Sequence, residues 1–129
     1  MERDVLYKIK FYEDNNGNKP VEKYLKELGN KKDKSSRIKY HKIIQYLDYL
    51  KEKGTFAGNP IVKHIEGDIW ELRPDKERIF FVVYHKGVFV LLHAFTKKTA
   101  KTPEKELERA RAEYKDLMER GFEKDEKRK

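Results

Sequence analysis

The sequence predicts one α+β domain, in which a twisted, mostly antiparallel sheet carries two N-terminal helices on one face. Apolar residues repeat every second position at the start of the chain, then with a helical period from residue 20, and again with a strand period from residue 60. The predicted order of elements is β-α-α-β-β-β-β-α. The length of 129 residues fits one hydrophobic core. We expect a single domain over residues 1–121, followed by a charged, disordered tail at 122–129.

The opening segment alternates between apolar and polar residues. Its apolar members, which fall on one face of an extended chain, are Val5, Tyr7, Ile9 and Phe11. This period of two predicts a strand with one buried face. The same alternation is unlike a secretory or transit peptide.

Two helices are predicted after a polar turn. The first covers residues 20–30, because proline suits the first helical position and the pair Gly-Asn suits the end. The second begins near Asp33 or Ser35 and ends at Gly54. The start of this second helix carries a run of cations: Lys31, Lys32, Lys34, Arg37, Lys39 and Lys42. Cations oppose the helix dipole there, so the run is either an ordinary solvated face or a basic surface for a polyanion.

Four strands are predicted from residue 60 onward. Two short ones cover residues 61–65 and 69–73, and the turn at 74–77 follows the second. The next two, at 78–85 and 88–95, are almost continuously apolar, which is typical of strands in the middle of a sheet.

The last predicted helix starts after Thr102, which we expect to be its N-cap, and ends at Gly121. Its apolar stripe consists of Leu107, Ala110, Tyr114, Leu117 and Met118. This stripe would pack on the domain or serve as a docking element.

The composition narrows the classes of function. The chain has 31 Lys plus Arg against 23 Asp plus Glu, and this net charge of +8 favours a polyanion or an acidic protein as partner. The lack of cysteine excludes a disulfide scaffold, a thiol nucleophile and Cys-based metal sites. No apolar run approaches the roughly 20 residues that span a bilayer, so we expect a cytoplasmic protein without a membrane partner. The four histidines lack metal-ligand spacing, and we expect no metal and no other cofactor.

Two arginines on the predicted sheet form the main candidate site. The four-residue turn at 74–77 would set Arg73 opposite Arg78, and like charges facing each other across strands are unfavourable unless an anion lies between them. Glu71 could supply a carboxylate from within the chain. A bound phosphate could do so instead, because guanidinium groups bind phosphate oxygens in a bidentate way. The sequence leaves both interpretations open.

Further candidates adjoin this pair. Lys63 lies on the neighbouring strand, and the segment at residues 95–102 follows the last central strand with three lysines: Lys97, Lys98 and Lys101. This segment is a basic rim of the sheet or only the polar loop before a helix. A lone His93 in an apolar strand is more often a core residue than a catalyst, and Trp70 fits either the core or a base-stacking role.

Three motifs at their joint spacing resemble a known protein family. They are G-N-P-I-V-K-H-I-x-G-D-I-W-E-L-R-P, R-I-F-F and L-L-H-A-F-x-K-K-T-x-K-T-P, and the match runs from about Tyr7 to about Leu117. Together they resemble the phage-derived, HigB-like branch of the RelE/ParE superfamily of type II toxin–antitoxin toxins. The resemblance implies a compact RelE-like fold. It also implies a metal-independent, ribosome-dependent mRNA endonuclease that a HigA-like helix-turn-helix antitoxin neutralises in a heteromeric complex.

The resemblance also implies roles for single residues. Arg73 and Arg78 would bind the phosphate and stabilise the charge of the transition state, while Lys97 would hold RNA or protonate the leaving group. Lys63 is a candidate proton acceptor. The candidate catalytic residues are therefore Arg73, Arg78, Lys97, Lys63 and His93, and the candidate RNA-binding residues are Lys98, Lys101, Glu71 and Trp70.

Two alternative functions remain open from the sequence. One is a ParE-like inhibitor of gyrase, and the other is a non-catalytic, basic nucleic-acid-binding phage protein.

Overall fold

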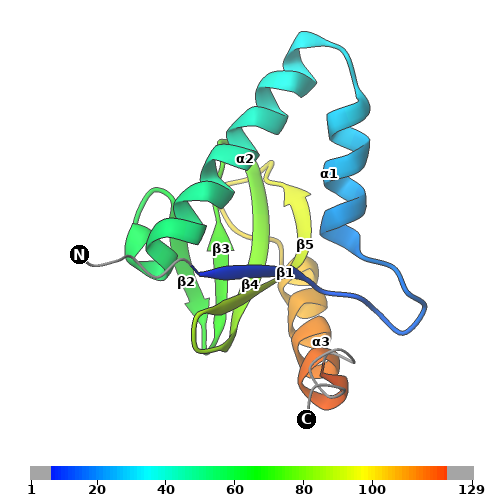
Figure 1. Cartoon of the computed structure of the whole chain (residues 1–129), viewed down its shortest axis with the longest axis vertical. Helices are drawn as coiled ribbons and strands as arrows, with labels where there is room; N and C mark the ends of the chain where they lie inside the picture. Colours follow the sequence, from blue (N-terminus) through cyan, green and yellow to red (C-terminus); the bar gives the residue numbers. More distant parts are fainter. Residues whose placement is uncertain (1–6, 122–129) are drawn as a thin grey trace.

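A five-stranded sheet in the order β1-β5-β4-β3-β2 forms the centre of the molecule (Figure 1). The computed structural model describes residues 7–121, so Val5 and the tail at 122–129 lie outside the described residues. Along the chain the elements are β1 (Lys8–Phe11), α1 (Pro20–Asn30), α2 (Lys34–Lys53), the 3-10 helix η1 (Gly54–Ala57), β2 (Val62–Glu66), β3 (Ile69–Leu72), β4 (Glu77–His85), β5 (Val88–Thr96) and α3 (Glu104–Arg120).

The sheet is antiparallel except at one edge. β1 pairs in parallel with β5, whereas β5, β4, β3 and β2 pair antiparallel in turn. The predicted α+β class and the mostly antiparallel sheet are confirmed. The two apolar runs are β4 and β5, which lie inside the sheet, as their composition predicted.

Helices cover both faces of the sheet. Residues of α1 and α2 form one core with the side chains of Ile79, Phe81 and Leu91. Residues of α3 form a second core on the other face, with Phe80, Val82 and Leu92. The prediction of two N-terminal helices on one face is confirmed, and α3 adds a third layer on the opposite face.

The helix boundaries follow the capping residues. The carboxylate of Asp33 accepts the backbone N–H of Ser36 at 2.9 Å and caps α2. α2 ends at Gly54, whose φ of 59° is left-handed. A Cβ at that glycine would lie 2.7 Å from the ring of Tyr7, which directly precedes β1, so this ring can pack against the end of α2 only because the residue is glycine.

Three local predictions are corrected. Pro103, not Thr102, is the N-cap of α3, because the Pro103 carbonyl accepts the first backbone bonds of the helix. Met118, predicted in the apolar stripe, is 52% exposed, because its neighbour Leu117 occupies the position that faces the sheet. Glu77, predicted in a turn, is the first residue of β4 and is buried.

Candidate functional site

Arg73 and Arg78 flank one buried carboxylate on the α3 side of the sheet. The last pair in the β3–β4 register, Leu72 with Ile79, brings Arg73 beside Arg78, as the turn length predicted. Glu71 lies on the same face of β3 and is 1% exposed. Its Oε1 lies 3.6 Å from Nε of Arg73 and 3.8 Å from Nε of Arg78. The internal carboxylate that the sequence offered as one alternative therefore lies between the two arginines.

This carboxylate does not satisfy the donors around it. Both distances are longer than a hydrogen bond, and Nε of Arg73, Nε of Arg78 and Oε2 of Glu71 are buried without a hydrogen-bond partner in the part of the chain that the structure describes. Buried polar atoms without partners are rare because each costs free energy. Glu71 therefore leaves part of the hydrogen-bonding capacity of the two guanidinium groups unused.

The backbone of the β3–β4 turn holds one guanidinium in place. Nη1 of Arg78 donates to the carbonyl oxygens of Asp75, at 2.7 Å, and Glu77, at 2.8 Å. Asp75 adopts a φ of 57°, a left-handed conformation that aspartate tolerates better than most residues. Nη1 of Arg73 donates to Oδ1 of Asn59 at 3.2 Å. Both arginines are therefore anchored at one nitrogen.

Two lysines complete what we call the cation cluster: Lys63, Arg73, Arg78 and Lys97 around Glu71. Lys63 is the register partner of Glu71 across β2 and β3. Burial lowers the pKa of Lys97, Glu71 opposes this effect, and Arg78, Arg73 and Lys63 lower the pKa further. Burial likewise lowers the pKa of Arg78. These mutual effects indicate that the four cations share one electrostatic environment.

A cleft of about 690 Å³ opens beside the cluster. We call it the rim cleft; its lining residues are Asp75, Lys76, Arg78, Thr96, Lys97, Lys98, Thr99 and Ala100. The backbone N–H of Lys97 donates to the Lys76 carbonyl at 2.8 Å, which fixes one wall to the other. Lys98 lines the cleft, while Lys101 is exposed on the following loop, where its carbonyl accepts the hydroxyl of Thr99.

The structure does not bring His93 and Trp70 to this cluster. His93 is 1% exposed beneath α3, with Nδ1 2.6 Å from Glu113 and Nε2 3.0 Å from Glu106. Trp70 precedes Glu71 in β3 and so lies on the opposite face, where its ring contacts His64 and Phe81.

Sequence reasoning missed a second buried carboxylate, on the α1–α2 side of the same strands. Glu77 is 1% exposed and accepts the hydroxyl of Tyr24 at 2.6 Å and that of Thr96 at 3.0 Å. Nζ of Lys39 lies 3.4 Å away. Burial, and then the contact with Glu77, raises the pKa of Tyr24. Extending the alternation of Ile79 and Phe81 back by one step would have placed Glu77 on this face.

The described residues contain neither a metal site nor a membrane-spanning helix. Within residues 7–121, no group of three or more His, Asp or Glu side chains is arranged to hold a metal ion. None of the helices in that range combines the length and apolar character needed to cross a membrane.

The chain matches one protein-family model. The model, described as phage-derived protein Gp49-like (DUF891), matches residues 23–115, a range that includes every member of the cation cluster. A comparison with curated proteins found no match.

Proposed function

Because the chain belongs to the family of phage-derived Gp49-like proteins, a RelE/HigB-like toxin family in general, we propose that it cleaves mRNA on the ribosome. In this proposal it is the toxin of a type II toxin–antitoxin system. The observation that carries the proposal is a pair of neighbouring guanidinium groups that the carboxylate of Glu71 approaches only beyond hydrogen-bond distance, with Lys63 and Lys97 beside them. That arrangement suits a phosphodiester at the point where its negative charge increases.

The proposed reaction is transfer of the phosphodiester to the neighbouring ribose hydroxyl. The 2′-oxygen of the RNA forms a bond to the adjacent phosphorus, and the bond from phosphorus to the 5′-oxygen breaks. One proton leaves the 2′-hydroxyl and one proton is delivered to the 5′-oxygen, which gives a 2′,3′-cyclic phosphate and a 5′-hydroxyl. The attacking group belongs to the RNA, so the protein has to position the backbone, move protons and stabilise charge.

Each member of the cation cluster takes one part of this task. Arg73 and Arg78 would bind the non-bridging phosphate oxygens with their unanchored terminal N–H groups. Lys97 is the candidate acid for the 5′-oxygen, because burial lowers its pKa and a lower pKa makes the ammonium group a better proton donor. Lys63 would hold the RNA or accept the proton of the 2′-hydroxyl. Glu71 would orient both guanidinium groups.

The proposal includes a partner protein. We expect a HigA-like helix-turn-helix antitoxin to form a heteromeric complex with the chain and to cover part of its basic surface.

Cell-free translation provides the test. The purified protein is added to a translation reaction, and new 5′ ends of the mRNA are mapped beside an Arg73→Lys/Arg78→Lys variant and a charge-removing Arg73→Ala/Arg78→Ala variant. We expect cleavage within translated codons, which both variants lose, because lysine keeps the charge but not the bidentate geometry. The control, Lys86→Ala/Lys115→Ala, removes two exposed cations elsewhere and should cleave like the parent protein.

Two results would count against the proposal. Intact mRNA and undiminished translation at excess protein would contradict the nuclease function. Accumulation of gyrase–DNA cleavage complexes would then favour a gyrase inhibitor. Cleavage that persists in both arginine variants would keep the function but move the chemistry away from the arginine pair. Circular dichroism of each variant checks that it folds.

A further inference from the structure

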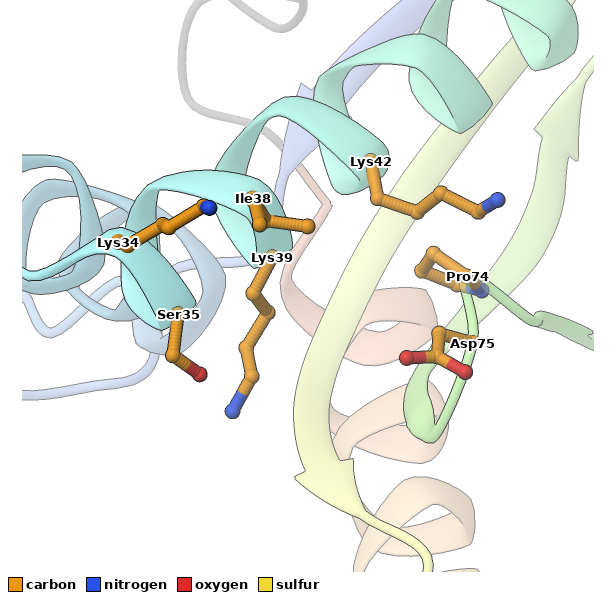
Figure 2. Close-up of a pocket in the computed structure, with 7 residues that line it drawn as sticks. All are labelled: Lys34, Ser35, Ile38, Lys39, Lys42, Pro74 and Asp75. Atoms are coloured by element: carbon orange, nitrogen blue, oxygen red, sulfur yellow. The ribbon is translucent and has the colours of Figure 1, made fainter.

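A second groove lies on the other side of the β3–β4 turn. It has a volume of about 670 Å³, and we call it the α2 groove; its lining residues are Lys34, Ser35, Ile38, Lys39, Lys42, Pro74 and Asp75. Figure 2 shows Lys42 extending from α2 toward the turn that carries Pro74 and Asp75, while Lys39 extends from the same helix in another direction. These cations belong to the run at the start of α2 that the sequence left as a solvated face or a polyanion surface.

The charges in this groove are not explained by the stability of the helix. A cation in the first turn of a helix opposes its dipole, and Lys34 lies in that turn of α2, which has no acidic residue. Lys39 is held by Glu77, but no carboxylate within residues 7–121 forms an ion pair with Lys34 or Lys42. Two of the three lysines therefore project positive charge that the described chain does not neutralise.

The groove and the rim cleft lie on the two sides of one turn. Asp75 of the β3–β4 turn lines both cavities, so the two hollows adjoin there. Arg78, Lys97 and Lys98 line one side of that junction, and Lys34, Lys39 and Lys42 line the other. A strand with one phosphate at Arg78 would meet further cations if it continued across the turn toward α2.

One apolar side chain completes the groove. Ile38 is 59% exposed and lies between the lysines on the same face of α2 (Figure 2). An exposed apolar surface beside several cations suits a nucleotide, which presents an anionic phosphate together with an apolar base face.

We infer that the α2 groove binds the phosphate backbone of single-stranded RNA and extends the path of the strand beyond the cation cluster. The inference rests on the proposed function for the identity of the polyanion. It assigns Lys34 and Lys42 to phosphate contacts and Ile38 to contact with a base or ribose.

The test measures binding without cleavage. The probe is a fluorescein-labelled single-stranded RNA in which every 2′-hydroxyl is methylated, so that it cannot react by attack of that hydroxyl. Fluorescence anisotropy gives its binding constant at several salt concentrations. The test variant is Lys34→Gln/Lys42→Gln, which keeps Lys39 and therefore the contact with Glu77. The matched control, Lys86→Gln/Lys115→Gln, removes the same charge from exposed positions outside both cavities.

Loss of two phosphate contacts should reduce the slope of log binding constant against log salt by about 1.4, since each contact to a single strand contributes about 0.7. The control should keep the slope of the parent protein. Equal slopes for the test variant and the control would overturn the inference. So would a test variant that keeps the parental RNA slope but loses affinity for a labelled polyglutamate peptide, because the groove would then fit an acidic protein.

The same samples separate this inference from the proposed function. If the test variant has a reduced salt slope but the parent protein does not cleave mRNA, the α2 groove is supported as an RNA-binding site and the proposed nuclease function is contradicted. If the parent protein cleaves mRNA but the test variant and the control have equal salt slopes, the nuclease function is supported and RNA binding by the α2 groove is contradicted.

Discussion

Glu71 and Glu77 are both buried strand carboxylates, but they face opposite sides of the sheet and have different partners. Glu71 lies between two arginines at distances longer than hydrogen bonds, and one of its oxygens has no partner among the described residues. Glu77 accepts two hydroxyl groups and lies beside a lysine. The first is incompletely paired at the proposed site, and the second is well paired behind it.

Replacing Glu71 with Gln should weaken the fold and strengthen the response to phosphate. The variant leaves two guanidinium groups without their carboxylate, so we expect a loss of about 1–3 kcal/mol in the free energy of unfolding. Inorganic phosphate can take the place of the missing charge and should stabilise the variant more than the parent protein. Urea unfolding in chloride and in phosphate buffers measures both effects.

Glu119→Gln serves as the control for this experiment, because Glu119 is exposed. It should unfold like the parent protein in both buffers. A Glu71→Gln protein whose stability is the same in chloride and phosphate would contradict an anion site at the arginine pair.

Replacing Tyr24 with Phe should destabilise the protein by about 1.5–3 kcal/mol, because it removes a hydrogen bond to the buried carboxylate of Glu77. The matched control is Tyr49→Phe, which removes an exposed hydroxyl contact of 3.2 Å with Gln45 and should change stability by less than about 0.5 kcal/mol. Chemical denaturation of the three proteins checks the difference. Equal midpoints for the two variants would mean that the hydrogen bond from Tyr24 to Glu77 does not stabilise the fold.

At the scale of elements, contacts near both ends of α3 fix it to the sheet. Glu106 near its start and Glu113 in its middle contact the two ring nitrogens of His93 on β5. Near its end, Asp116 accepts the hydroxyl of Tyr12 at 2.6 Å, and Nη2 of Arg120 donates to the carbonyl of Glu13 at 2.6 Å. These contacts fix the helix to the sheet along its length.

The contact near the end of α3 should make stability depend on pH in acid. Arg120 lowers the pKa of Asp116 from 3.8 to about 2, with a further contribution from Tyr12. A depressed pKa stabilises the fold above the unfolded value, and this stability is lost as pH falls from about 4 to about 2. Melting temperatures across this range should therefore fall less steeply for Asp116→Asn than for the parent protein. Asp48→Asn, at an exposed position of α2, should follow the parent curve.

The sequence predicted the elements well where the signal is local. Proline and glycine marked the ends of α1 and α2, and alternation marked the strands, so their positions agree within a residue or two. Strand pairings and side-chain contacts between distant segments could not be predicted, because no local sequence pattern indicates them. The parallel pairing of β1 with β5 and the contact of Tyr24 with Glu77 are of this kind.

The candidate site was predictable to a similar extent. The turn length predicts Arg73 beside Arg78, and the sequence offers Glu71 as a carboxylate between them. The rim cleft and the α2 groove depend on where the turn lies relative to α2 and to the loop after β5, which only tertiary packing determines.

For the whole molecule, the central strands should be the last to open. β4 and β5 have neighbours on both edges and helices on both faces, whereas β2 and β1 are edge strands. Hydrogen exchange should therefore be slowest for backbone amides of β4 and β5 and faster for those of β2. Amides of β2 that exchange as slowly as those of β4 would contradict this order. Mass spectrometry of peptides from the exchanged protein provides the measurement.

The edge pairing of β1 with β5 also bears on how the protein is made. The first strand of the chain finds its place only beside the last strand, so during synthesis it stays without its partner until residues 88–96 have left the ribosome. The cation cluster reaches completion at the same stage, because Lys97 directly follows β5. A nascent chain therefore carries no assembled site until most of it has been translated.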